Sequence, residues 1–142
     1  MLVFTNLRAM IGKNNISIGL LTMGVFMLYG FLLIYLRDFA PNSKEWAESY
    51  SIGKHFESRL AHVHGNLFAF LNIVIGYLLL QFSDRLSYKK TVSILSLTGL
   101  LMPLGILGEV YLGLPPIFVL VGAVAMTAGV FILGVSFIKF KS

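Results

Sequence analysis

The sequence contains no cysteine, which excludes disulfides, thiolate metal sites and cysteine nucleophiles. Charged residues are also scarce, at 12% of the 142 positions, whereas apolar residues reach 57%. A small soluble domain buries only about two-thirds of the area of its unfolded chain, so a water-soluble chain of this length could not hide so much apolar surface. The surroundings of the chain are therefore predicted to be largely lipid.

Recognisable catalytic and nucleotide-binding motifs are missing as well. The sequence has no Gly-x-Ser-x-Gly element, no phosphate-binding loop and no dinucleotide-binding fingerprint. The net charge is +5, but the basic residues do not form a patch with interleaved aromatic side chains, so no nucleic-acid binding is predicted. In a membrane protein, basic residues instead tend to mark the cytoplasmic side.

What the sequence does contain is a set of long uncharged runs. Each run is long enough for a helix to cross the hydrocarbon core, which takes roughly 20 apolar residues. Strands are excluded because the apolar runs are continuous rather than alternating, and so few strands could not close a barrel. We predict an all-α integral membrane protein, a four-helix transmembrane bundle. It forms a single domain over 1–142, with spans at about 15–36, 61–82, 91–109 and 116–138.

Short features refine this picture. The first span is too long for a typical signal peptide and lacks a clear cleavage site, so it is expected to be retained. The outer loop 37–59 is long enough for a short amphipathic helix, and Pro103 predicts a kink in the third span. Small residues in the last span predict a packing seam for another helix, formed by Gly122, Ala125 and Gly129.

Lysine and arginine are unevenly divided between the two sides of the predicted bundle. The N-terminus, the 82–90 loop and the C-terminus together carry seven, whereas the 37–59 loop carries four and the 109–116 turn none. This bias predicts a multi-pass protein of the inner (plasma) membrane with both termini in the cytoplasm. All three histidines then lie on the outer side, so polar chemistry is expected at the outer mouth of the bundle.

The segment RLAHVHGNLFAFLN, residues 59–72, brings imidazole and amide groups to the start of the second span. At 100° per residue, one stripe of this helix holds polar residues and then small ones: His55, Arg59, His62, Asn66, Ala69 and Gly76. His64 and Glu57 fall on the opposite side. Small residues mark close helix approach, and polar groups in membranes turn toward the bundle, so His62 is predicted to face inward. His64 is expected to face lipid headgroups, a second subunit or a cofactor held between subunits.

Neutral imidazole is a good ligand for haem iron, copper and zinc, so this segment is a candidate site. The candidate cofactor-binding residues are His62, His64, Arg59 and Asn66, and the candidate metal ligands are His62, His64, His55 and Glu57. The cofactor expected is haem b or copper. Two histidines separated by one residue project about 200° apart on a helix, which disfavours one small ion held by both. A haem would need a further axial ligand, such as Met102, Met126 or a residue of a second copy.

The same segment resembles the start of the second helix of haem-copper oxidase subunit I, particularly the cbb3-type and nitric-oxide-reductase branch. There an Arg-x-x-His provides a low-spin haem ligand. The segment is also similar to small four-helix bacterial membrane proteins in which His-x-His-x-Asn-Leu opens the second helix. By position, the resemblance implies that His62 is a haem ligand with Arg59 beside it, and that His64 and Asn66 belong to the motif. The later oxidase helices have no counterpart, so oxygen reduction by this chain alone is not implied.

A second resemblance is to the membrane-associated eicosanoid and glutathione metabolism family, whose four-helix chains form trimers. Their second helix carries Arg-Ala-His-x-Asn-x-x-Glu, and this chain offers His62, His64 and Asn66 there. The arginine and the glutamate are absent at the matching positions, and the fourth span has no arginine. These departures put glutathione binding in doubt, because it depends on such charges.

We therefore expect a haem- or metal-binding redox or accessory protein with an outer-side site centred on the second helix. The alternative is a non-catalytic structural or partner-binding subunit, in which polar residues such as Asn66 and Asn72 only join helices. A membrane glutathione-transferase-like enzyme is the third hypothesis, and whether the chain is an enzyme stays open. The expected partners are the lipid bilayer and either further copies of the chain or other subunits of a membrane complex.

Overall fold

The computed structural model describes residues 2–139, with side chains described from residue 11 onward. Throughout these residues the regular structure is helical, which confirms the predicted all-α fold class. The helices are α1 (Leu2–Asp38), α2 (Ser43–Glu48), α3 (Gly53–Gln81), α4 (Lys89–Gly99), α5 (Leu101–Leu112) and α6 (Ile117–Ile138).

The described residues include four helical segments long and apolar enough to cross a membrane: Ile11–Asp38, Gly53–Gln81, Lys89–Leu112 and Ile117–Ile138. They overlap the four predicted spans, as expected for a multi-pass membrane protein. The largest differences are at the helix starts: α1 begins at Leu2 rather than near 15, and α3 begins at Gly53 rather than near 61. The first turns of α3 are polar, and apolarity alone does not reveal a helix that extends beyond the hydrocarbon. The short helix expected in the 37–59 loop is present as α2.

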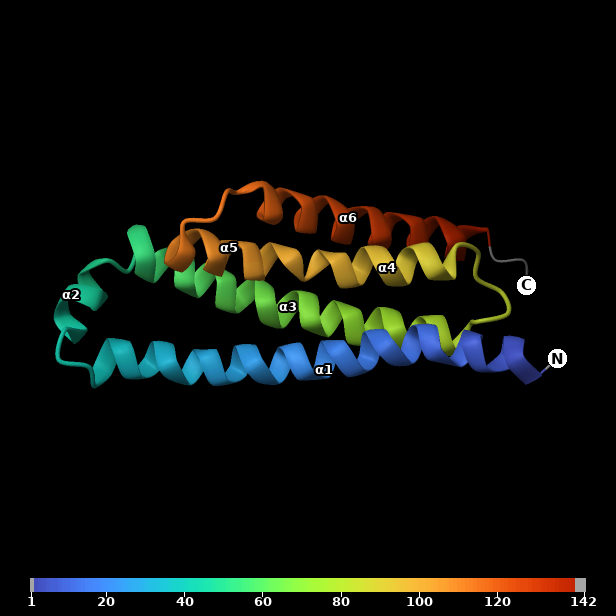
Figure 1. The fold of residues 1–142 in the computed structure, drawn as a ribbon, viewed down its shortest axis with the longest axis horizontal. Coiled ribbons are helices and arrows are strands. Elements are labelled where there is room, and N and C mark those ends of the chain that lie inside the picture. Colours follow the sequence, from blue (N-terminus) through green and yellow to red (C-terminus); the bar gives the residue numbers. More distant parts are fainter. Residues whose placement is uncertain (1, 140–142) are drawn as a thin grey trace.

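The long helices run antiparallel, with α1 beside α3, α3 beside the α4–α5 pair, and α6 against α4 and α5 (Figure 1). The beginning of α1 and the end of α6 lie at one end of the molecule, and α2 lies at the other (Figure 1). We call these the inner end and the outer end, after the orientation expected from the sequence. The histidine-bearing half of α3 is at the outer end.

Small residues allow α1 and α3 to pack with their backbones close together. A Cβ added at Gly12 would lie 2.5 Å from the carbonyl oxygen of Gly76, and one added at Gly19 would lie 2.8 Å from that of Ala69. Ala69 and Gly76 belong to the predicted polar-and-small stripe of α3. The stripe therefore faces α1 along the length of the helix, which confirms that it points toward a neighbouring helix.

The third span is broken as Pro103 predicts. Its missing N–H leaves the carbonyl four residues earlier without a helical partner, and α4 ends there, at Gly99, before α5 begins at Leu101. The seam on α6 is also confirmed. Gly122, Ala125 and Gly129 are buried, and a Cβ added at Gly122 would clash with the backbone of Met102.

A buried polar network joins α1, α3 and α4 in the inner half of the bundle. Asn15 Nδ2 donates to Asn72 Oδ1 (2.9 Å) and to Ser96 Oγ (2.9 Å), and Ser93 Oγ donates to Asn15 Oδ1. Asn72 Nδ2 donates to the carbonyl oxygen of Ser96 at 2.8 Å. Asn15, Asn72 and Ser96 have no exposed surface. Asn72 thus joins helices, as one of the sequence hypotheses supposes, and its partner Asn15 was not anticipated.

Candidate functional site

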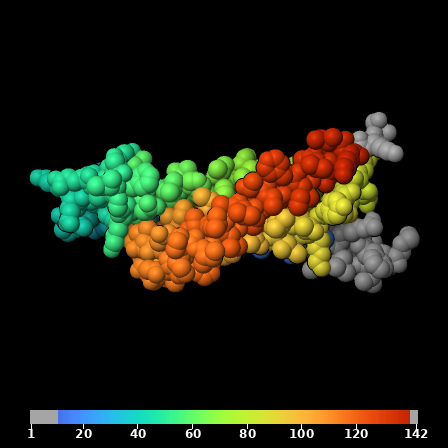
Figure 2. Space-filling view, turned by 90° about the horizontal axis from the view of Figure 1, so that it is seen from above, coloured from blue at the N-terminus to red at the C-terminus, as the bar shows by residue number. Residues whose placement is uncertain are grey.

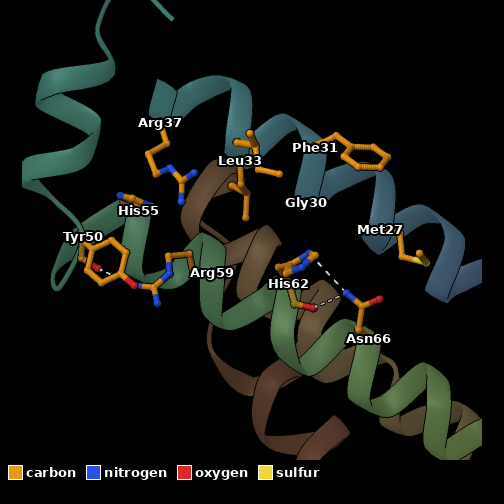
Figure 3. Close-up of a pocket in the computed structure, with 11 residues that line it drawn as sticks. Met27, Gly30, Phe31, Leu33, Arg37, Tyr50, His55, Arg59, His62 and Asn66 are labelled. Carbon is orange, nitrogen blue, oxygen red and sulfur yellow. Dashed lines mark hydrogen bonds between the residues drawn. The ribbon is translucent and has the colours of Figure 1, made fainter. Parts of the chain in front are cut away.

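A cleft of about 440 Å³ lies between the outer half of α1 and the first turns of α3 (Figure 3). We call it the α1–α3 cleft. Its volume is within the range of small-molecule and cofactor sites. The lining residues come from α1, α3 and the connection between them: Met27, Gly30, Phe31, Leu33, Ile34, Arg37, Tyr50, His55, Arg59, His62 and Asn66.

The imidazole of His62 is held in one tautomer. Its Nδ1 lies 2.9 Å from the carbonyl oxygen of Phe26 on α1. A carbonyl oxygen can only accept, so Nδ1 carries the proton and Nε2 presents a lone pair. Nε2 of His62 has no hydrogen-bond partner in the part of the chain that the structure describes. Among the described residues, the one side-chain nitrogen or oxygen that is both buried and without a partner is Trp46 Nε1, so Nε2 of His62 is not buried. A histidine fixed in this way through Nδ1 has the arrangement typical of metal-bound imidazole.

Gly30 makes the position of His62 possible. A Cβ added at Gly30 would lie 2.6 Å from Cε1 of the imidazole, so any other residue would displace the ring. Gly30 follows Phe26 by one helical turn, and without a side chain there the carbonyl of Phe26 is open to His62. The Phe26 ring is itself buried against Gly65 of α3, where a Cβ would clash with it. Two glycines on facing helices thus set the depth of the imidazole.

Asn66 lies one turn beyond His62 and is held by its own helix. Its Nδ2 donates to the carbonyl oxygen of His62 at 2.9 Å. The same nitrogen is 3.5 Å from Nδ1 of His62, but both atoms are donors when His62 bonds Phe26, so this contact is not a hydrogen bond. Asn66 therefore lines the cleft without joining two helices, unlike Asn72.

His55 also borders the cleft, and its surroundings indicate a structural role. Its Nδ1 donates to the carbonyl oxygen of Trp46 at 2.7 Å. The ring stacks on Trp46 with centroids 4.9 Å apart and meets the edge of Tyr50 at 5.3 Å. Only 2% of His55 is exposed. These contacts fasten α2 and the following loop to the start of α3, which closes the outer end of the cleft.

Two guanidinium groups stand at the outer rim of the cleft (Figure 3). Arg37 is paired with Asp38 at 2.7 Å. Arg59 lies 3.6 Å from the centroid of the Tyr50 ring and donates to the carbonyl oxygen of Tyr50 at 3.2 Å. Arg59 has no carboxylate partner within the part of the chain that the structure describes. The rim therefore carries one guanidinium charge without a carboxylate partner, that of Arg59, which suits an acidic group on a ligand.

His64 and Glu57 lie outside the cleft, as the helical wheel predicts. His64 Nδ1 donates to the carbonyl oxygen of Leu60 at 2.9 Å, within α3, and its ring meets the edge of Phe68. Among residues 11–139, no group of three or more His, Cys, Asp or Glu side chains is arranged to hold a metal ion. A metal site built from His55, Glu57, His62 and His64 of one chain therefore lacks support, because His55 and His62 lie on one side of the helix and Glu57 and His64 on the other.

Seven of the cleft's lining residues were not anticipated from the sequence, among them Gly30, Arg37 and Tyr50. They come from α1 and the 37–59 loop, so finding them requires knowing that α1 packs on α3. The sequence carries one signal of this pairing. Gly12, Gly19 and Phe26 recur every seven residues on α1, a spacing typical of a helix that packs along one neighbour.

A group of hydroxyls borders the site at the outer end. The hydroxyl of Tyr111 on α5 lies 2.8 Å from Ser58 Oγ on α3 and 3.2 Å from the hydroxyl of Tyr29 on α1. Tyr111 thus joins three helices.

No protein-family model, curated protein or solved structure matches the chain.

Proposed function

We propose that the chain is a membrane-embedded haem-binding redox or accessory protein, with the α1–α3 cleft as its site and His62 as the axial ligand. The observation that carries this proposal is the state of His62. Its Nδ1 is fixed on the Phe26 carbonyl, and its Nε2 is unpaired at a cleft of cofactor size. The resemblance of residues 59–72 to a haem-binding helix points to the same imidazole.

The chemistry of the lining favours haem over a bare copper or zinc ion. One accessible imidazole is a poor site for an ion that needs three or four protein ligands. Haem supplies its own ring nitrogens and takes only axial ligands from the protein. The cleft also matches the two parts of a haem, its apolar ring and its carboxylate groups. Met27, Phe31 and Ile34 offer apolar surface to the ring, and Arg59 at the rim suits a carboxylate.

Each residue then has a distinct task. His62 binds through Nε2, and the Phe26 carbonyl orients the imidazole and increases its basicity. Arg59 orients an acidic group at the outer rim, and Tyr50 holds Arg59 in place by stacking under it. A bound haem would supply one-electron chemistry.

A haem titration of the purified protein tests this proposal, with Gly30→Ala as the informative variant. The added methyl group displaces the imidazole from the Phe26 carbonyl, and we expect haem affinity to fall by at least about tenfold, the usual cost of losing such a supporting contact. Absorption in the Soret region gives the affinity. Gly24→Ala is the matched control, because it lies on the same helix and a Cβ there meets nothing within 4 Å. Equal affinities for the two variants would contradict the assigned site.

The non-catalytic subunit remains a second candidate, favoured by the inner polar network. Asn15, Asn72 and Ser96 bond to one another within the chain and need no ligand, which is what joining helices requires. Failure of the wild-type protein to bind haem would leave this candidate as the better one. A glutathione-conjugation assay separates both from the transferase hypothesis, which predicts turnover.

For the orientation, we propose an inner-membrane protein with both termini in the cytoplasm. The absence of native cysteine permits single-thiol labelling at Ser51, in the outer loop, and at Ser87, in the 82–88 connection. In intact cells, a membrane-impermeant maleimide is expected to label Ser51→Cys at once and Ser87→Cys only after permeabilisation. The reverse labelling pattern would show that the outer loop faces the cytoplasm and would contradict the proposed orientation.

A further inference from the structure

A groove of about 390 Å³ opens at the inner end, between the start of α4 and the end of α6. Viewed from above, the final turns of α6 lie against the first turns of α4 at this end (Figure 2). We call this groove between α4 and α6 the inner groove. The lining residues are Ser87, Tyr88, Thr91, Phe131, Ile132, Val135, Ser136 and Lys139.

The inner groove is polar at one end and apolar at the other. Ser87 and Thr91 come from the start of α4, and Lys139 follows the last turn of α6, so these groups lie at the level where the helices leave the membrane. Phe131 and Val135 lie further into the span. Ser136 Oγ donates to the carbonyl oxygen of Ile132 in its own helix at 2.8 Å and lies 3.3 Å from the carbonyl oxygen of Ser87, so α6 approaches the loop closely here. The groove therefore fits an amphipathic molecule with its polar head at the membrane surface.

A second, apolar groove of about 540 Å³ runs between α6 and α3. The lining residues are Phe68, Leu71, Met126, Thr127, Val130, Phe131, Gly134, Val135 and Ile138. Phe131 and Val135 line both grooves and are one turn apart on α6, so they form a ridge between two channels. Beside this ridge, Gly134 leaves space, since a Cβ there meets nothing within 4 Å. Two channels on either side of one ridge match the two acyl chains of a phospholipid.

The positive charge at the inner end favours an anionic lipid head group. The lining of the inner groove includes Lys139 and no acidic residue. Lys90 is exposed in the first turn of α4, and Asp84 is the only acidic residue in the 82–88 connection. Basic pockets between membrane helices bind anionic lipid head groups, which a zwitterionic lipid with its own cation matches less well. The positive charge therefore complements a phosphate without a compensating ammonium group.

We propose that the two grooves bind one anionic phospholipid. Lys139, Ser87 and Thr91 contact its phosphate, and the acyl chains lie on either side of the Phe131–Val135 ridge. This site is at the opposite end from the α1–α3 cleft, so it does not depend on the proposed haem function. The bound lipid covers the face of α6 that the other helices leave open.

Native mass spectrometry of the full chain tests the proposal, with phosphatidylglycerol and phosphatidylcholine of identical acyl chains added at equal concentration. We expect one phosphatidylglycerol to be retained in preference to phosphatidylcholine. Lys139→Gln is expected to weaken its retention about fivefold, the effect of one lysine near a phosphate. Lys44→Gln on α2, at the outer end, is the matched control and should retain the lipid.

A second variant tests the acyl-chain channel separately from charge. Gly134→Leu fills the apolar groove where the folded chain leaves space, so it should fold normally and still lose phosphatidylglycerol. Equal retention of the two lipids, or unchanged retention in both Lys139→Gln and Gly134→Leu, would overturn the proposal. Displacement of phosphatidylglycerol by an equal concentration of inorganic phosphate would also overturn it, because it would mean that a free anion rather than a lipid is recognised.

Discussion

Replacing Asn72 with alanine is expected to lower the free energy of unfolding by about 2 kcal/mol, a large effect for a single side chain in a membrane bundle. The substitution removes one of the acceptors for Asn15 Nδ2 and the donor to the Ser96 carbonyl. Both of these partners belong to residues without exposed surface, so neither can turn to water. Unfolding of the purified protein in mixed detergent micelles, with helicity followed by circular dichroism, measures the change.

Asn66→Ala is the matched control for this prediction. Asn66 is the same residue type on the same helix, but its amide bonds only to a carbonyl of its own helix. The change is expected to alter stability by about 0.5 kcal/mol or less, as is usual for a group outside the core. If the two variants lose equal stability, the inner network does not hold the three helices together.

The network also shows how far the fold could be predicted. Uncharged runs of sufficient length predict the spans, because the hydrocarbon thickness sets a physical length that a helix must meet. They do not predict which helices pack together, because lipid solvates any apolar face as well as another helix does. Asn15 illustrates the limit. It sits at the start of an apolar run and its partner Asn72 is distant in sequence, so only the pairing of α1 with α3 identifies it as buried.

The site was predictable to the same extent. A helix has a fixed angular period, so the sequence alone places His62, Asn66 and Arg59 on one face and His64 on the other. The same period disfavours convergence of the four candidate metal ligands, because it sets Glu57 and His64 opposite His55 and His62, and the described residues show no such cluster. Gly30 and Arg37 reach the cleft from α1. The 3.6-residue period of α3 carries no information about them.

Replacing His62 with alanine is expected to abolish haem binding, with a loss of affinity above about 100-fold. This exceeds the 10–100-fold cost of removing a supporting contact, because the substitution removes the metal ligand itself. Stability should change far less than in Asn72→Ala. His62 is only partly buried. Its loss removes one hydrogen bond to the Phe26 carbonyl, and that carbonyl stays within helix α1.

His64→Ala provides the control at the same depth. His64 lies two residues away on the same helix, and its Nδ1 bonds to a carbonyl within α3, so its removal tests for general effects of losing an imidazole. His55→Ala is expected to act differently from both. It would remove the hydrogen bond and the stacking to Trp46 that fasten α2 to the start of α3, and thereby loosen the outer end of the cleft.

The most direct measurement is the absorption spectrum of the protein purified from its native membrane, recorded for the wild type, His62→Ala and His64→Ala. The account predicts a Soret band for the wild type and for His64→Ala, and none for His62→Ala. A wild-type protein without the band, or a band that survives in His62→Ala, would contradict the assignment of His62 as the haem ligand.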